Sequence, residues 1–370
     1  MNVLKPKTEA QVEEAIAWAL ETKTPVTVKG QGTKSRFAPP ATPEHTLDLG
    51  NVSGILSYEP DELVISALVA TPVSTIEEAL KQEGQHLAFE PPGLVPNATL
   101  GGLVSAGSSG PRRLAAGGVR DHILGLSGVT GRAQSFKIGG RVVKNVTGYD
   151  LSKLLTGSWG TLAVMTRITM KVLPAPPETR TLRLTGNSRD KTLNLLRRAA
   201  ASPYQVTGAA LLTEGDGVVR LEGRDDEIDQ RFDLLNEMLD GPTQKLETEA
   251  SVSIWQDVGS LAALSKDEPI WRVECPRSLA HDVLALVPDH KALVDWAGAR
   301  LWLSGDLSDA DQSAIQALGA RLSLLRGDES DWHRQAARVS ETPALAALQS
   351  RIRDAFDPLR LLNPHVPKRG

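Results

Sequence analysis

The stretch EPPGLVPNATLGGLVSAGSSGPRRLAAGGVRDHILGL, residues 90–126, decides how this 370-residue chain folds. Glycine, serine and alanine crowd the stretch, so it has little apolar area to bury in a core. Glycine lets the backbone approach a ligand closely, and exposed N–H groups in such turns form anion-binding concavities. The stretch therefore predicts contact with a phosphate-bearing ligand. The alternative is a flexible linker, but Pro91 and Pro92 stiffen its entry and residues 119–124 resume an ordered pattern.

Two further glycine turns lie on either side of this stretch. The first, PVTVKGQGTK at 25–34, is a short strand pattern that runs directly into glycine. It lacks the spacing of a nucleotide triphosphate loop and the GxGxxG of a nicotinamide-binding Rossmann unit. The second joins GGRVVKNVTGYDL at 139–151 to LTGSWGTLAV at 155–164. One such turn is equally consistent with an ordinary connection between elements, but three in this order are specific.

The composition is that of a globular protein without a strong charge bias. A net charge of −4, a pI near 6.0 and 41% hydrophobic residues give no electrostatic footprint for nucleic acid. No apolar run is long enough to span a bilayer, and the N-terminus lacks the apolar core of a signal peptide. We therefore expect a cytoplasmic location, with any membrane association arising through partners.

The cysteine and histidine content argues against metal chemistry in this chain. Cys275 is the only cysteine, which excludes an intrachain disulfide and a cysteine-ligated iron–sulfur cluster. The seven histidines include no His-x-His or His-x-x-x-His pair, so no metal site is expected. The tryptophans of the C-terminal half are interpreted as packing or interface residues: Trp255, Trp271, Trp296, Trp302 and Trp332.

The phrase KNVTGYDLSKLLTGSWGTLAVMTRITMKVLP, residues 144–174, carries most of a family resemblance. With the other two turns, it resembles the FAD-binding domain of the vanillyl-alcohol oxidase type, also called the PCMH type, over residues 5–174. Within that superfamily the chain is most similar to the FAD-binding subunits of bacterial glycolate oxidases. It departs from the pattern at Ala163, where relatives often have glycine, and around Gly107, where glycine replaces a common asparagine.

The resemblance implies an α+β fold with a PCMH-type, two-subdomain FAD-binding domain at 1–175 and an α+β cap domain at 176–344. The proline-rich segment 174–177 marks the linker between them. The C-terminal segment 345–370 is expected to return to the FAD-binding domain. Its Asn363 is interpreted either as a flavin neighbour or as part of a terminal Asn-Pro turn. A helix beginning at Leu103 is expected to direct its N-terminus at the FAD pyrophosphate.

The resemblance also implies noncovalent FAD and assigns contacts with it to particular residues. Gly118 is expected near the flavin, and an Arg120–Asp121 ion pair is expected to lock the neighbouring turn. The expected cofactor-binding residues are Gly30, Gln31, Gly32, Thr33, Lys34, Pro92, Thr99, Leu100, Gly101, Gly102, Ser105, Gly107, Ser108, Gly118, Gly160 and Val164.

The function implied is that of a subunit of a glycolate oxidase-type complex, which oxidises a small 2-hydroxy acid and passes electrons onward. The expected partners are a larger FAD-containing catalytic subunit and an iron–sulfur subunit. One alternative is a self-sufficient D-2-hydroxyacid dehydrogenase, which needs a general base and cations for the substrate carboxylate. Another alternative is an interaction subunit without catalysis of its own. No catalytic residue is identified; the candidates near the predicted site are Arg112, Arg113, Lys144, Tyr149 and Arg167.

Overall fold

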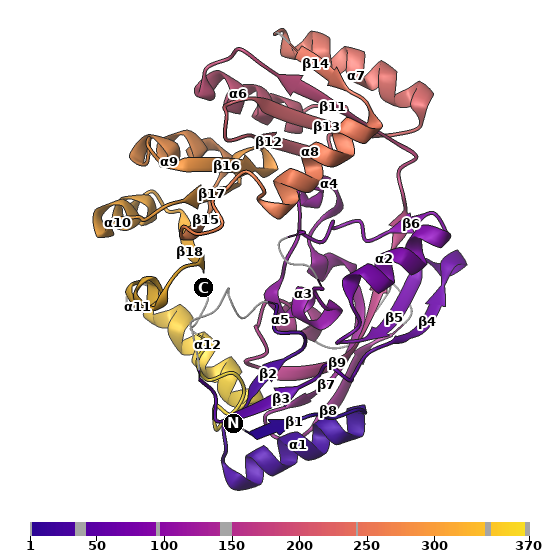
Figure 1. Cartoon of the computed structure of the whole chain (residues 1–370), viewed down its shortest axis with the longest axis vertical. Helices are drawn as coiled ribbons and strands as arrows, with labels where there is room; N and C mark the ends of the chain where they lie inside the picture. The colour runs from indigo at the N-terminus through magenta and orange to yellow at the C-terminus, as the bar shows by residue number, and fades with distance from the viewer. Residues whose placement is uncertain are drawn as a thin grey trace.

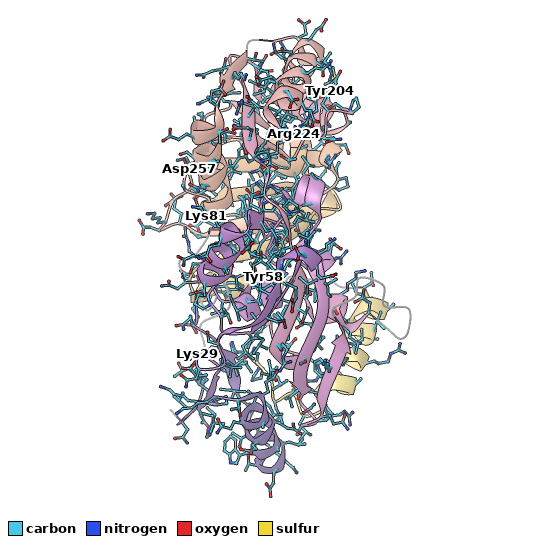
Figure 2. The ribbon with its side chains drawn as sticks, turned by 90° about the vertical axis from the view of Figure 1, so that its right-hand side faces the viewer. Lys29, Tyr58, Lys81, Tyr204, Arg224 and Asp257 are labelled. Atoms are coloured by element: carbon cyan, nitrogen blue, oxygen red, sulfur yellow. The ribbon has the colours of Figure 1, made fainter. Side chains whose placement is uncertain are left out.

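The computed structural model describes residues 2–33, 42–93, 97–140, 150–241, 243–336 and 342–366. An N-terminal domain and a cap form two ends of an elongated molecule (Figure 1). Tyr204 and Arg224 of the cap lie far from Lys29 of the N-terminal domain, with Tyr58 between them (Figure 2). Helix α12 (Pro343–Phe356) leaves the cap and lies beside the N-terminal domain, so the end of the chain returns to its beginning (Figure 1).

The first subdomain is a small parallel sheet with one helix. Strands β1 (Asn2–Leu4), β3 (His45–Asp48) and β2 (Thr27–Lys29) pair in that order, and α1 (Glu9–Thr22) follows β1. The sequence TEAQ at 8–11 predicts a helix that begins after Thr8, and the Thr8 side chain indeed accepts the Gln11 N–H. Val12, Ile16 and Ala19 are buried along one face of α1, as their spacing predicts.

The second subdomain is a five-stranded antiparallel sheet with the order β4-β5-β9-β7-β8. It shares one apolar core with α1 and with the helices that follow its strands. The sequence pattern predicts one strand over residues 161–173, but this stretch divides into β9 and β10. Strand β10 pairs with β6, which has two residues although the pattern of residues 85–89 predicts a longer strand. The elements are β4 (Ile55–Glu59), β5 (Val64–Leu68), α2 (Val73–Gln82), β6 (Gln85–His86), α3 (Leu100–Ala106), α4 (Arg113–Ala116), β7 (Ile123–Thr130), β8 (Ser135–Gly139), α5 (Leu151–Leu155), β9 (Ala163–Lys171) and β10 (Leu173–Pro174).

The cap is an eight-stranded antiparallel sheet, as far as the chain is described, with the order β14-β11-β13-β12-β16-β17-β15-β18. Alternate residues of its strands face two separate cores, because successive side chains of a strand point to opposite faces. Leu211 lies in the core under α6, α7, α9 and α10, whereas Leu212 faces the core under α8. The strands are β11 (Glu178–Leu184), β12 (Gly208–Leu211), β13 (Gly217–Gly223), β14 (Thr243–Leu246), β15 (Ile270–Glu274), β16 (Lys291–Asp295), β17 (Arg300–Ser304) and β18 (Arg321–Arg326).

Sequence patterns predicted only part of the cap. The helices are α6 (Arg189–Ala200), α7 (Asp225–Leu239), α8 (Thr248–Ser260), α9 (Ala280–Leu286), α10 (Asp309–Ala317) and α11 (Glu329–Ala336). Short sequence patterns predict several of the cap elements, among them strands at 181–184 and 218–223 and a helix at 226–239. They do not predict helices α8 and α11 or strands β14, β16 and β18. Strand β14 has no buried side chain, so neither face gives an alternating pattern. All five cap tryptophans are buried, which confirms their interpretation as packing residues.

A buried carboxyl at the end of β16 makes cap stability depend on pH. Asp295 is 4% exposed, and its burial raises the pKa from an ordinary 3.8 to about 7, even though Arg300 and Arg220 oppose that rise. Glu90, the other charged group facing it, raises the pKa further. In the unfolded chain this carboxyl ionises near 3.8. Its contribution therefore stabilises the fold most at low pH and is lost as pH rises through about 7.

We expect Asp295→Asn to stabilise the protein more at pH 8 than at pH 5. In the natural protein the Trp296 N–H donates to the Asp295 carboxyl group at 2.7 Å. Asparagine stays neutral at both pH values, and its amide oxygen can accept the same N–H. Thermal unfolding of both proteins at the two pH values measures the difference. An equal change in melting temperature at pH 5 and pH 8 contradicts the expected ionisation of Asp295.

Candidate functional site

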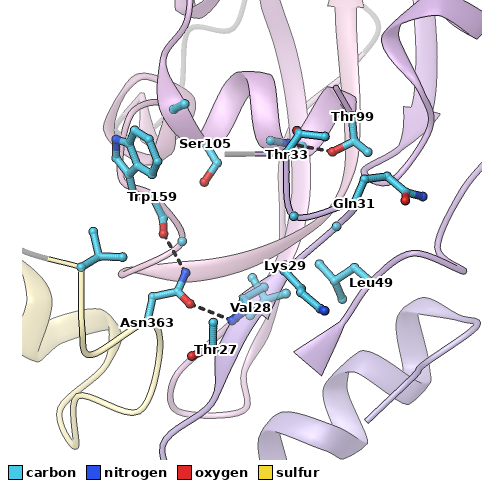
Figure 3. A pocket seen from close by; sticks show the side chains of 18 of the residues that line it. Thr27, Val28, Lys29, Gln31, Thr33, Leu49, Thr99, Ser105, Trp159 and Asn363 are labelled. Carbon is cyan, nitrogen blue, oxygen red and sulfur yellow. Dashed lines mark hydrogen bonds between the residues drawn. The ribbon is translucent and has the colours of Figure 1, made fainter. Parts of the chain in front are cut away.

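A pocket of about 720 Å³ lies between the end of β2, helix α3, the turn at 157–160 and the C-terminal residues 363–366 (Figure 3). This volume is in the range of cofactor and small-molecule sites. The lining residues are Thr27, Val28, Lys29, Gly30, Gln31, Gly32, Thr33, Pro43, Thr46, Leu49, Val69, Ala70, Thr99, Gly101, Gly102, Ser105, Ala106, Trp159, Gly160, Ala163, Val164, Met165, Arg326, Gly327, Trp332, Asn363, His365 and Val366.

Two glycines allow the walls of the pocket to pack closely. A Cβ at Gly30 would lie 3.1 Å from the Thr99 hydroxyl oxygen, and a Cβ at Gly101 would lie 2.7 Å from the Val69 Cβ. The second distance is shorter than any side chain tolerates. The start of α3 therefore depends on Gly101 to pack against Val69, and the turn after β2 packs closely against Thr99 through Gly30.

Helix α3 begins at Leu100 and not at Leu103, so the prediction of its start is wrong. Thr99 caps it by accepting the Gly102 N–H at 3.2 Å. The Leu100 N–H donates to the Thr71 carbonyl at 3.0 Å, and the Gly101 N–H donates to the Val69 carbonyl at 2.7 Å. The first-turn N–H groups thus have acceptors within the protein, although Gly101 and Gly102 line the pocket. Contact of this helix end with the pyrophosphate stays a prediction.

Asn363 connects the C-terminal segment to two walls of the pocket. Its amide oxygen accepts the Val28 N–H at 2.7 Å, and its amide nitrogen donates to the Trp159 carbonyl at 2.7 Å (Figure 3). The side chain is buried, with 5% of the residue exposed. Asn363 thus lines the pocket and fixes the terminal turn, and its contact with the flavin stays a prediction.

The electrostatics of the pocket favour an anion. No carboxylate is among the described residues that line it, whereas Lys29 and Arg326 contribute positive charge. His365 also lines the pocket, and burial lowers its pKa, which keeps the imidazole neutral at pH 7. Leu49, Val164 and other apolar residues cover the remaining wall. Cations and hydroxyls beside an apolar wall fit a cofactor with a pyrophosphate and flat rings, which is what FAD requires.

The structure brings most of the expected cofactor-binding residues to this pocket. Those that line it are Gly30, Gln31, Gly32, Thr33, Thr99, Gly101, Gly102, Ser105, Gly160 and Val164. Five others are not among its lining residues: Pro92, Leu100, Gly107, Ser108 and Gly118. Leu100 is instead buried in the core, and Lys34 lies outside the described residues. Direct contact of any of these residues with FAD stays a prediction.

Several lining residues were not predicted from the sequence. Lys29 and Thr27 precede the Gly30 turn, and Trp159 lies inside the quoted GSWG turn, so the neighbouring motifs could have indicated them. Arg326, Gly327 and Trp332 come from the cap, and no local pattern connects them with the glycine turns.

The three described arginines considered for a substrate carboxylate have partners elsewhere. Arg112 forms an ion pair with Glu222 at 2.6 Å, and Arg167 pairs with Glu9 at 2.7 Å. Arg113 stacks over the Trp296 ring at 4.7 Å. Lys144 and Tyr149 lie outside the described residues.

The expected Arg120–Asp121 ion pair does not lock its turn. The two side chains are 3.9 Å apart and half-exposed, which makes their interaction weak. The Asp121 carboxylate instead accepts the Gly118 N–H at 2.8 Å. The turn is therefore fixed by a bond from the carboxylate to the backbone.

The two-subdomain architecture, the cap and the electropositive pocket define a PCMH-type FAD-binding flavoprotein. The family described as "FAD binding domain" matches residues 2–150. Glycolate oxidase subunit GlcE of Escherichia coli is 36% identical over 298 residues, which cover 80% of each chain. The chain therefore belongs to the family of this subunit and is an FAD-dependent oxidoreductase.

Other relatives match about half of this chain. D-lactate dehydrogenase of Archaeoglobus fulgidus is 30% identical over 172 residues, 46% of this chain and 38% of the relative. Glycolate oxidase subunit GlcD of Bacillus subtilis is 30% identical over 182 residues, 49% of this chain and 38% of the relative. An alkyldihydroxyacetonephosphate synthase structure aligns with a TM-score of 0.70 and 14% identity, covering 99% of this chain and 76% of that one, which shows the fold alone.

Two further structural features bear on location and metal binding. None of the helices in the described ranges is long and apolar enough to cross a membrane. The described residues also contain no group of three or more histidine, cysteine, aspartate or glutamate side chains that could hold a metal ion.

Proposed function

We propose that this chain is the FAD-binding subunit of a glycolate oxidase-type complex in the cytoplasm. The complex oxidises a small 2-hydroxy acid to the 2-oxo acid and passes the electrons onward. Bound FAD supplies the redox chemistry by accepting the electron pair, while the protein binds and orients it noncovalently. The observation that carries this proposal is the 36% identity to GlcE over 80% of both chains.

The occupied cations support a role beside partner subunits. A self-sufficient enzyme needs guanidinium or ammonium groups free to bind the substrate carboxylate. Arg112 and Arg167 are instead paired with glutamates, and Arg113 is stacked on a tryptophan. The lone cysteine cannot hold an iron–sulfur cluster, so electron transfer through such a cluster requires another chain. The proposed partners are therefore a larger FAD-containing catalytic subunit and an iron–sulfur subunit.

Reconstitution tests this proposal. We expect the isolated chain to release FAD into the supernatant after acid precipitation and to turn over glycolate and D-lactate poorly with an artificial acceptor. Addition of both partner subunits is expected to give high turnover. High activity of the isolated chain, unchanged by the partners, contradicts the subunit role. A chain that stays colourless when FAD is added favours an interaction subunit without catalysis.

The second candidate function is a self-sufficient D-2-hydroxyacid dehydrogenase. His365 is the observation that favours it, because a neutral imidazole lining the pocket could act as a general base. Under this alternative the isolated chain oxidises D-lactate, and His365→Gln removes that activity while FAD stays bound.

A further inference from the structure

The turn at 109–113, which follows α3, is held by side chains of the cap. The Trp296 indole N–H donates to the Gly110 carbonyl at 3.1 Å, and Arg300 donates to the Ser109 carbonyl at 3.4 Å. The Trp296 ring lies between two guanidinium groups, with the Arg300 Cζ at 3.5 Å and the Arg113 Cζ at 4.7 Å from its centroid. One indole therefore connects the cap to both ends of this turn.

A buried ion cluster holds the same turn from its other side. The Glu90 carboxylate accepts hydrogen bonds from both terminal nitrogens of Arg220, at 2.8 and 3.0 Å. It also accepts the backbone N–H of Arg112 at 2.6 Å. The Arg112 guanidinium donates two hydrogen bonds to the Glu222 carboxylate, at 2.6 and 3.0 Å. Arg220 is 1% exposed, and the side chain of Glu222 is 6% exposed, so the centre of the cluster is shielded from water. Removal of one partner would leave a buried charge unpaired, which fixes the geometry strongly.

Strained backbone occurs at the residues that make these contacts. Trp296, Ala297 and Glu90 all have left-handed backbone, with φ of 53°, 57° and 54°. Such a conformation costs a non-glycine residue on the order of 1 kcal/mol or more and persists only where the surroundings fix it. The cost falls on the two residues that hold the turn, Trp296 of the cap and Glu90 of the N-terminal domain.

The turn is connected to the FAD pocket through α3. Gly107 ends α3, and Ser108 connects it to the turn at 109–113. The last carbonyls of the helix hold the opposite wall of the pocket: Val104 accepts the Gly157 N–H at 3.0 Å, and Ser105 accepts the Trp159 N–H at 2.9 Å. Ser105 and Trp159 both line the pocket. A shift of the turn would therefore move both walls.

We propose that Trp296, Arg300 and the Arg220–Glu90–Arg112–Glu222 cluster are positioning residues that hold α3 and Trp159 in the FAD-binding arrangement. The cap thereby sets the affinity for FAD, although these residues do not line the pocket. The inference rests on FAD binding and is independent of the substrate and partners, so reconstitution of turnover does not decide it.

The Trp296→Phe variant tests this inference, because phenylalanine keeps a ring for the two guanidinium groups but lacks the N–H donor. We expect the Kd for FAD to rise about fivefold to tenfold, as for the loss of one buried hydrogen bond. The visible circular dichroism of the flavin at saturating FAD is expected to change as well. Arg300→Lys, which keeps a positive charge for Glu274 but removes the guanidinium N–H that donates to Ser109, is expected to act in the same direction.

Arg180→Gln is the matched control. Arg180 holds a more exposed cluster with Glu178, Asp225 and Glu247 on the same sheet. Its hydrogen bonds go to residues 178, 179, 225 and 248, away from the turn at 109–113. It is expected to lower the melting temperature but to leave the FAD Kd and the flavin spectrum unchanged. Wild-type affinity and spectrum in both Trp296→Phe and Arg300→Lys would overturn the proposal. An equal loss of affinity in Arg180→Gln would also overturn it, because general destabilisation would then explain the effect.

Discussion

Gly32→Trp is expected to purify without flavin. Gly32 lines the pocket with a φ of +68°, and a Cβ built there meets no atom within 4 Å. The side chain therefore starts in open space beside the pocket, and we expect the indole to occupy the space of the cofactor. We expect the FAD Kd to rise about a hundredfold or more, equivalent to ~2.7 kcal/mol. FAD titration of the purified protein, followed by flavin fluorescence, measures the change.

Gly84→Trp separates occupation of the pocket from backbone strain. Gly84 has a φ of +61°, a Cβ there also meets nothing within 4 Å, and the residue is exposed just after α2. Both variants bear the same left-handed strain, of order 1–2 kcal/mol. Only Gly32→Trp is expected to lose FAD. If it keeps wild-type affinity, or if Gly84→Trp loses FAD equally, the turn after β2 does not hold the cofactor.

Local sequence patterns predicted the parts of the site that depend on backbone conformation. The turn after β2 and the turn at 157–160 both contribute residues to the pocket. They could be predicted because glycine content alone indicates where backbones approach closely. The hydrogen bond that caps the N-terminus of helix α1 is equally local, since Thr8 and Gln11 are three residues apart. These features depend on neighbours in the sequence and therefore need no knowledge of the fold.

Contacts between distant segments could not be predicted in this way. Arg326 and Trp332 reach the pocket because β18 is an edge strand of the cap sheet and α11 follows it in the chain. The α3 N–H groups were expected to be open, but the carbonyls of Thr71 and Val69 occupy two of them. Arg112 was considered for a substrate carboxylate, yet its partner Glu222 lies 110 residues away. In each case the sequence shows which chemical group is present, whereas tertiary packing decides which group it contacts.

Asn363→Ala is expected to weaken both the fold and FAD binding. The substitution removes the Asn363 side chain, which is in a residue only 5% exposed, from the Val28 N–H and the Trp159 carbonyl. Each unsatisfied buried group costs about 1–3 kcal/mol, so a loss of about 2–5 kcal/mol in the free energy of unfolding is expected. The left-handed backbone of Asn363, φ 44°, adds strain, because asparagine tolerates this region better than alanine. Denaturant unfolding of the FAD-free protein measures the stability term.

The Asn363→Asp variant separates the two hydrogen bonds, because aspartate has the same shape. A carboxylate still accepts the Val28 N–H, but it cannot donate to the Trp159 carbonyl and sets an oxygen against it. We expect FAD affinity to fall in both Asn363 variants. Asn187→Ala is the matched control, since Asn187 makes one backbone bond, to the Thr185 carbonyl at 3.1 Å, in a cap turn. Wild-type FAD affinity in Asn363→Asp would mean that the contact with Trp159 does not shape the pocket, and that the return of the C-terminal segment serves folding alone.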